Sequence, residues 1–223
     1  MIITPNRELE SAVYQYIKDS MAYERTGLHA SSLIFCNYKA YFESTEEVAV
    51  LSDERAIMFC LGHALQFFLF PVQQSDSEVF EVDGIQLTPD LLDMSISFYY
   101  LHLAEVKSTR ASSAKFSLYD NEHYIIQMKN YCKAVGVLES DFISFFLMGD
   151  YKPSFPRLGC WNVKFTQKEI DDNWDEMLRR KVILEHAIEN KELPSPRITM
   201  PWECKYCDYT EVCPTRNGNH VDI

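Results

Sequence analysis

Four of the seven cysteines form the pattern that most constrains how this chain folds. Three lie close together near its end, in Cys204-Lys205-Tyr206-Cys207 and Cys213-Pro214, whereas Cys36 lies far upstream. In a reducing compartment, cysteines clustered in this way bind metal more often than they form disulfides. If the four share one site, the two ends of the chain must meet, because the distant ligand closes a loop over most of the sequence. The other cysteines are expected to be ordinary core or surface thiols: Cys60, Cys132 and Cys160.

Two kinds of metal centre fit four thiolates, a zinc ion and a [4Fe-4S] cluster. Cys204-x-x-Cys207 alone is the usual half of a zinc site. The five residues between Cys207 and Cys213, together with the distant Cys36, are unusual for a zinc ribbon and favour the cluster. Either centre would act structurally, by holding together chain ends that otherwise fray.

The size and composition fit one globular domain. The chain has 223 residues, 47% of them hydrophobic, and no stretch has the composition of a linker. We therefore expect a single domain over residues 1–223, with its core at about 53–190 and cluster-binding segments at about 30–42 and 200–215. No apolar run is long enough to span a bilayer, and the first residues lack the layout of a signal peptide. We expect a cytoplasmic protein with no membrane partner, and the sequence gives no indication of its oligomeric state.

The net charge of −12 counts against a protein that binds nucleic acid through a broad basic surface. Much of the acidic charge falls in residues 43–54 and 168–192, which we expect to be solvated faces. A narrower basic groove is still available from five side chains: Lys107, Arg110, Lys115, Lys129 and Lys133.

Hydrophobic periodicity and turn residues predict a mixed α/β domain with a central mixed sheet flanked by helices. Helices are expected over residues 6–22, around Cys36 after a cap at Ser31 or Ser32, and over 53–70, 121–135 and 166–190. The last of these begins with a capping box, Thr166 followed by Glu169. Strands are expected over 78–82, 85–92, 95–107, 141–148 and 159–165, with Asp83-Gly84 turning the first into the second.

Two carboxylates and a lysine near the end of the strand region have the chemistry of a catalytic metal site. Glu105 and Lys107 are two residues apart and therefore face the same side of a strand. Asp90 ends or bends the neighbouring strand, so its carboxylate can reach an ion held by Glu105 and the backbone carbonyl of Val106. Mg²⁺ and Mn²⁺ prefer such oxygen ligands, and Lys107 is placed to stabilise charge that develops on a phosphate. The position of Glu105 in an apolar strand supports this, because a buried charge is costly.

Asp90 with Glu105-x-Lys107 resembles the core of the PD-(D/E)-x-K nucleases, in their RecB-like exonuclease branch. That branch carries a Gln-x-x-x-Tyr motif on a downstream helix, and Gln127-Met128-Lys129-Asn130-Tyr131 stands at the corresponding place. Residues four apart share a helix face. The resemblance implies a restriction-endonuclease-like core in which Gln127 contacts Lys107 or a phosphate and Tyr131 stacks on a base or sugar.

The chain departs from this branch at one metal ligand. The branch has Gly-x-x-x-His on the helix before the sheet, but here Gly62 is followed four residues later by Gln66. Gln66 offers a carbonyl oxygen, a weaker ligand than imidazole. His63 directly follows the glycine, about 100° away around the helix, and is expected to face elsewhere.

The cysteine pattern resembles the iron–sulfur members of the same branch, which include the CRISPR-associated RecB-like exonucleases and the AddB nuclease domain. The resemblance implies a [4Fe-4S] cluster on Cys36, Cys204, Cys207 and Cys213 that clamps a helical amino-terminal segment to the carboxy-terminal tail. It also implies a Mg²⁺- or Mn²⁺-dependent exonuclease acting on single-stranded or end-containing DNA, in recombination, repair or CRISPR adaptation, with proteins of those pathways as possible partners. The alternative is a non-catalytic module that keeps the nuclease fold and binds DNA or a protein. The Gln66 departure and the acidic charge favour it slightly, whereas the intact Asp90, Glu105 and Lys107 argue against it.

Overall fold

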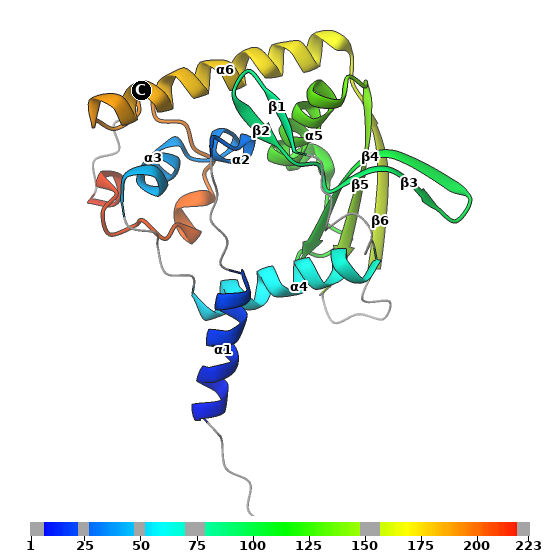
Figure 1. Cartoon of the computed structure of the whole chain (residues 1–223), viewed down its shortest axis with the longest axis horizontal. Helices are drawn as coiled ribbons and strands as arrows, with labels where there is room; N and C mark the ends of the chain where they lie inside the picture. The colour runs from blue at the N-terminus through cyan, green and yellow to red at the C-terminus, as the bar shows by residue number, and fades with distance from the viewer. Residues whose placement is uncertain (1–6, 22–26, 47–51, 70–78, 148–156, 218–223) are drawn as a thin grey trace, which may run out of the picture.

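The computed structural model describes residues 7–21, 27–46, 52–69, 79–147 and 157–217. Its centre is a four-stranded sheet in the order β3 (Leu91–Ile96), β4 (Tyr99–Thr109), β5 (Glu139–Phe146) and β6 (Arg157–Lys164). The sheet is mixed, because β4 and β5 run parallel whereas the outer pairs are antiparallel. A parallel pair needs a crossover connection, and α5 (Glu122–Val135) provides it. The predicted mixed α/β architecture, a central sheet with flanking helices, is confirmed (Figure 1).

The main core lies between the sheet and two helices stacked on one of its faces. Leu103 of β4 and Phe142 of β5 are buried in one cluster with Met128 of α5 and Met177 of α6 (Gln167–Asn190). The two helices pack along each other, and Figure 1 shows α6 lying across α5 on the side away from the sheet. The odd-numbered side chains of β4 that follow Leu103 therefore point towards α5.

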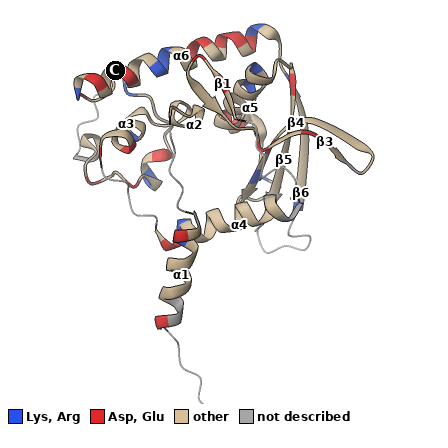
Figure 2. Cartoon of the chain, in the orientation of Figure 1, with Lys and Arg blue, Asp and Glu red and all other residues tan. Residues whose placement is uncertain are grey.

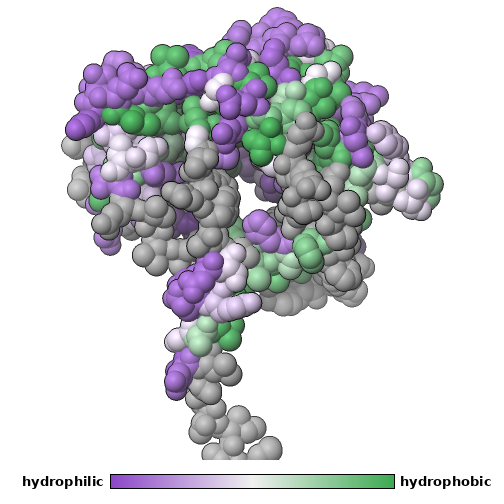
Figure 3. Space-filling view, in the orientation of Figure 1, coloured by the Kyte–Doolittle hydropathy of each residue, from purple (hydrophilic) through white to green (hydrophobic). Residues whose placement is uncertain are grey.

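The last long helix begins as predicted. The Thr166 hydroxyl accepts a hydrogen bond from the Glu169 N–H at 3.3 Å, and the Glu169 carboxylate accepts one from the Thr166 N–H at 2.8 Å, which completes the capping box. Charged residues of both signs follow along the exposed side of α6 (Figure 2), and hydrophilic residues predominate there in Figure 3. The expectation that the acidic residues of this segment form a solvated face is confirmed.

The predicted hairpin at Asp83-Gly84 exists, but it forms a separate two-stranded sheet. β1 (Phe80–Val82) pairs with β2 (Ile85–Leu87), and both turn residues have positive φ, 51° at Asp83 and 73° at Gly84. The strand expected over 85–92 ends at Leu87, and a bend at Asp90 precedes β3. The indole N–H of Trp174 in α6 donates to the Asp83 carboxylate at 2.8 Å and holds this hairpin against the helix.

The single strand expected over residues 95–107 is wrong, because the chain reverses inside it. β3 ends at Ile96, the turn is Ser97-Phe98, and β4 begins at Tyr99. Ser97 has φ of 55°, a conformation that tight hairpin turns usually give to Gly, Asn or Asp. With none of these residues at the turn, the apolar pattern continues through it.

The amino-terminal helices lie on the other side of the molecule. α1 (Arg7–Met21) projects from the body and packs on α4 (Asp53–Leu69), which contacts β4 (Figure 1). Both helices lie within two residues of their predicted bounds. None of the helices in the described part of the chain has the length and apolar character needed to cross a membrane.

Cys36 lies between two short helices, α2 (Ala30–Ile34) and α3 (Asn37–Thr45), at the residue that precedes α3. The expectation that Ser31 or Ser32 caps a helix carrying Cys36 is therefore wrong, since both serines lie inside α2. The carboxy-terminal tail, with short 3-10 turns η2 (Glu203–Tyr206) and η3 (Pro214–Asn217), lies beside α3 in Figure 1.

Candidate functional site

The carboxylates of Asp90 and Glu105 lie close together where β3 begins to pair with β4. Pairing of β3 with β4 starts at Leu91, opposite Ala104. Asp90, one residue earlier, replaces the missing strand partner, because its Oδ2 accepts a hydrogen bond from the Val106 N–H at 2.8 Å. Both backbone groups of a strand residue point to the same edge, so the Val106 carbonyl also faces the Asp90 side.

Glu105 is fully buried next to this carboxylate. Its side chain is 0% exposed, and neither of its oxygens accepts a hydrogen bond of normal geometry from the described residues. Lys107, two residues along the same face, forms an ion pair with Glu105 Oε1, and its Nζ lies 3.8 Å from Asp90 Oδ2. Burial first, and then the charge of Asp90, raises the pKa of Glu105 to about 8, although the Lys107 ammonium opposes the shift.

This arrangement fits a divalent cation. A buried carboxylate with free lone pairs beside a second carboxylate is poorly neutralised by one ammonium, and a hard cation supplies the missing positive charge and accepts those lone pairs. Asp90, Glu105 and the Val106 carbonyl are three such oxygen donors. Within the described ranges no group of three or more His, Cys, Asp or Glu side chains is arranged to hold a metal ion, so the remaining ligands would be backbone oxygen, water or substrate. Gln66 lies in α4, but its side chain is outside the described residues.

Gln127 and Tyr131 lie together one turn apart on α5, as the spacing predicts. The Gln127 amide donates to the Tyr131 hydroxyl at 2.7 Å. Burial, followed by the charges of Glu105 and Asp90, raises the pKa of Tyr131 well above its ordinary value, so this hydroxyl is neutral and lies near both carboxylates. Tyr131 is only 5% exposed and belongs to the main core. The expectation that it stacks on a base or sugar is therefore wrong, because α6 and the sheet enclose the ring.

A cavity of about 330 Å³ opens beside Lys107, between β4 and α4. From α4 it is lined by Phe59, Gly62 and His63, among others. His63 was expected to face elsewhere, but it is exposed and lines the same cavity as Lys107. His63 lies three residues before the expected ligand position at Gln66, and three residues turn an α-helix by about 300°, so the two positions are only about 60° apart around α4.

Three of the five side chains expected to form a basic groove are engaged with other groups. Of the five, Lys107 lines this cavity. Lys133 pairs with Asp171 of α6 at 2.8 Å, and Arg110 pairs with Glu54 at 3.0 Å. Helix packing turns Lys129 towards the Phe165 ring.

Sequence reasoning did not identify His123, which lies in the first turn of α5. Its ring packs against Tyr124, Phe35 and Trp202. Burial, and then the charge of Lys107, lowers the pKa of His123 to about 4, so the imidazole is neutral near pH 7. His123 therefore lies between the carboxylate site and the carboxy-terminal tail, a position that has no signal in the sequence.

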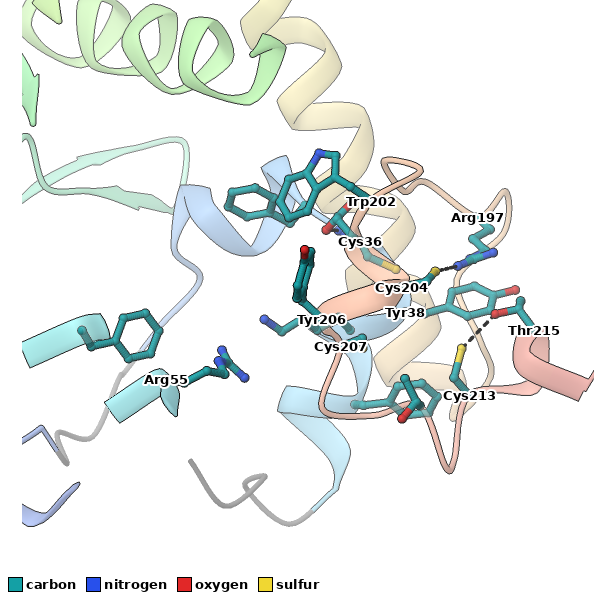
Figure 4. Close-up of a pocket in the computed structure, with 16 residues that line it drawn as sticks. Cys36, Tyr38, Arg55, Arg197, Trp202, Cys204, Tyr206, Cys207, Cys213 and Thr215 are labelled. Carbon is teal, nitrogen blue, oxygen red and sulfur yellow. Dashed lines mark hydrogen bonds between the residues drawn. The ribbon is translucent and has the colours of Figure 1, made fainter. Parts of the chain in front are cut away.

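The four clustered cysteines line one larger cavity, of about 550 Å³, between α3, α4 and the tail (Figure 4). Burial raises the pKa of the Cys207 thiol, and nearby Cys36 and Cys213 add to the rise. Arg197 donates to the Cys204 sulfur at 3.0 Å, and Cys213 Sγ lies 3.1 Å from the Thr215 hydroxyl. The structure thus brings Cys36 to the three tail cysteines, without the converged geometry of a closed metal site in the described part of the chain.

Protein hydrogen bonds also hold the tail against Cys36. The buried carboxylate of Glu203 accepts bonds from the Cys36 N–H at 2.8 Å and from the Met200 N–H at 2.6 Å. The Asn37 side chain exchanges bonds with the backbone of Pro196 and Ile198. The sequence gives only one signal for these residues, a polar Glu203 directly before Cys204.

Comparison with known proteins shows the fold. No protein-family model matches the chain, and neither does any curated protein sequence. The crystal structure of SSO0001 is similar over 94% of this chain and 97% of that one, with a TM-score of 0.57 and 16% identity. At this identity the similarity establishes a shared fold and no activity.

Two structures of exonucleases are less similar. A phage-related exonuclease from Haemophilus somnus 129PT matches 76% of this chain and 98% of its own, with a TM-score of 0.49 and 12% identity. LHK-Exo, an alkaline exonuclease from Laribacter hongkongensis solved in complex with dAMP, matches 74% of this chain and 91% of its own, with a TM-score of 0.43 and 18% identity.

Proposed function

We propose that this protein is a divalent-metal-dependent DNA exonuclease that hydrolyses phosphodiester bonds in single-stranded or end-containing DNA. The observation that carries the proposal is the environment of Glu105, which is fully buried, lies beside the Asp90 carboxylate and has the single Lys107 ammonium as its ion-pair partner. Such a carboxylate is costly in a purely structural role. A cation-binding role accounts for the cost.

The residues would divide the work as follows. Asp90, Glu105 and the Val106 carbonyl would hold Mg²⁺ or Mn²⁺, with Gln66 as a further candidate. The bound ion would supply an activated water and neutralise charge on the phosphate. Lys107 keeps its ammonium at the same edge, where it faces the adjacent cavity and would stabilise negative charge on a phosphate oxygen. The buried Tyr131 hydroxyl would help to orient the Glu105 carboxylate from the α5 side, and Gln127 would hold that hydroxyl in place.

We further propose that Cys36, Cys204, Cys207 and Cys213 hold a [4Fe-4S] cluster, with zinc as the alternative. Support comes from the cavity that all four line and from the Arg197 guanidinium beside Cys204, which would offset the charge of thiolates. Metal analysis of anaerobically purified protein separates the two. Broad visible absorbance with iron and sulfide supports the cluster, whereas a colourless protein containing zinc contradicts it.

A second candidate is a non-catalytic module that binds DNA or a protein. The ion pair between Lys107 and Glu105 favours it, because a lysine that fully neutralised Glu105 would leave no place for a metal. The Lys107 side chain is partly exposed and lines the adjacent cavity, which leaves room for the ammonium to move aside.

Cleavage of a 5′- or 3′-labelled single strand in Mn²⁺ tests the proposal. Wild-type protein is expected to release short products, and Glu105→Gln, which keeps the shape of the side chain, is expected to lose at least a hundredfold in rate. Glu185→Gln, at an exposed carboxylate on α6, serves as the matched control and should cut like wild type. Equal rates for wild type and Glu105→Gln, or no cutting of any DNA by either, would reject the nuclease assignment.

A further inference from the structure

The cavity that contains the cysteines has a second half with different chemistry. In Figure 4 the sulfur atoms of Cys36, Cys204 and Cys213 lie on one side, Arg55 of α4 lies on the other, and the Tyr206 ring stands between them, with Trp202 above Cys36 in this view. Trp202 is 44% exposed and Tyr206 is 62% exposed. A cavity that served only to enclose a metal centre would have no use for exposed aromatic faces directed away from the sulfur atoms.

This aromatic half is continuous with the proposed nuclease site. Phe59 of α4 lines both the cysteine cavity and the smaller cavity that contains Lys107. On the opposite wall, Trp202 packs on His123, and the charge of Lys107 reaches that imidazole. The two cavities therefore share a wall at Phe59, with Lys107 in one and Trp202 and Tyr206 in the other.

Cationic side chains line this surface beside the aromatic rings, although two of them are also in ion pairs. Three cationic side chains line the larger cavity: Lys39, which pairs with Glu43 at 3.5 Å, Arg55, which pairs with Asp208, and Arg197. One carboxylate, Glu203, also lines it. That carboxylate is buried and committed to backbone N–H groups. Lys205 adds a further ammonium over the Tyr206 ring, 5.4 Å from its centroid.

We propose that Phe59, Trp202 and Tyr206, with Arg55, form a binding site for an unpaired strand of DNA that extends from the nuclease site onto the cysteine-containing tail. Alternating aromatic faces and cations are the means by which proteins bind single strands without regard to sequence. Bases stack on such faces only when they are unpaired, so the site selects a single-stranded substrate over a duplex. The inference rests on the proposed function, which it deepens by naming the residues that would select a single strand.

The test measures binding separately from cutting. A fluorescent 20-nucleotide single strand is titrated with the full-length protein in Ca²⁺, and its anisotropy gives Kd for wild type, Phe59→Ala and Tyr206→Ala. We expect each variant to bind at least about fivefold more weakly, the lower end of what the loss of one base–aromatic stack costs. Tyr16→Ala is the matched control, because Tyr16 is an exposed tyrosine on the projecting helix α1 and lines neither cavity.

Two further ligands identify the cause of the weakening. An abasic strand of the same length keeps the phosphates but has no bases, so Tyr206→Ala should bind it as wild type does. A blunt duplex of the same sequence should also be bound equally by both. Unchanged visible absorbance and metal content in Tyr206→Ala would show that the sulfur site is intact.

The results separate this inference from the nuclease assignment. If Tyr206→Ala and Phe59→Ala bind the normal strand as tightly as wild type does, or weaken abasic and normal strands equally, the stacking site is rejected even when Glu105-dependent cutting is observed. If no cutting is found but both variants selectively lose affinity for the normal strand, the stacking site stands and the nuclease assignment is rejected.

Discussion

Replacement of Glu105 by Gln should stabilise the metal-free protein while it abolishes cutting. The carboxyl has a pKa raised to about 8, from 4.5, because of burial and the neighbouring charge of Asp90. Between these two values the unfolded chain is ionised at this position whereas the folded chain remains protonated. Raising the pH through this window therefore favours unfolding, and the stability present below about pH 4.5 is lost by about pH 8.

The size of the effect follows from the same two values. Each pKa unit corresponds to about 1.4 kcal/mol, so ionisation of Glu105 costs up to about 3 kcal/mol of stability at pH 7. Gln carries no charge at any pH and keeps the volume of the side chain. We expect Glu105→Gln to be close to wild type near pH 5 and to be more stable by up to about 4 kcal/mol near pH 8. For a chain of this size that raises Tm by several degrees, at about 2–4 °C per kcal/mol.

Urea unfolding followed by circular dichroism, in EDTA at pH 5, 6, 7 and 8, measures the difference between the two proteins. Comparing them at each pH removes the contributions of other groups, among them His123, whose lowered pKa makes the folded protein lose stability as the pH falls from about 6.5 towards 4. Added Mn²⁺ should restore wild-type stability at pH 8 and leave Glu105→Gln unchanged, because binding to the folded state alone stabilises it. A variant that is less stable than wild type at pH 8, or a difference that does not grow between pH 5 and pH 8, would refute the reasoning.

Two other substitutions probe parts of the structure outside the carboxylate site. Thr166→Ala removes the cap of α6 and should cost about 1 kcal/mol and 2–4 °C in Tm by calorimetry; an unchanged Tm would mean that the helix does not depend on its capping box. Glu203→Ala leaves the buried N–H groups of Cys36 and Met200 without their acceptor. It should lower stability by about 1–3 kcal/mol and also reduce the metal bound per chain, whereas full metal occupancy in this variant would show that the cysteines assemble without Glu203.

Sequence patterns were sufficient wherever the signal was local. The bounds of α4, α5 and α6 follow from periodicity and from the Thr166 cap, and the Asp83-Gly84 turn follows from two residues that readily adopt positive φ. The turn at Ser97 gave no such signal, so two antiparallel strands were taken as one. Pairing of β3 with β4 on either side of the turn stabilises the unfavourable positive φ of Ser97. That pairing cannot be recognised from the residues of the turn alone.

Some features of the candidate site were likewise predictable from local spacing, whereas others were not. The two-residue spacing of Glu105 and Lys107 was enough to place them on one face, and the i, i+4 spacing was enough to bring Gln127 to Tyr131. The burial of Tyr131 was not predictable, because whether a helix face meets solvent or another helix depends on how α6 packs on α5. His63 and His123 reached the site through helix packing in the same manner.

By itself the sequence determined the local elements, the pairing of residues at strand and helix spacings, and the set of cysteines that must meet if they bind one metal. Only the tertiary structure decided that Asp90 replaces a missing strand partner beside Glu105, and that the tail places Trp202 and Tyr206 opposite Phe59. The physical reason is the separation along the chain over which each kind of interaction acts. Periodicity and capping act within a few residues, whereas the charge environment of Glu105 and the shared wall at Phe59 arise from segments far apart in the chain that only packing brings together.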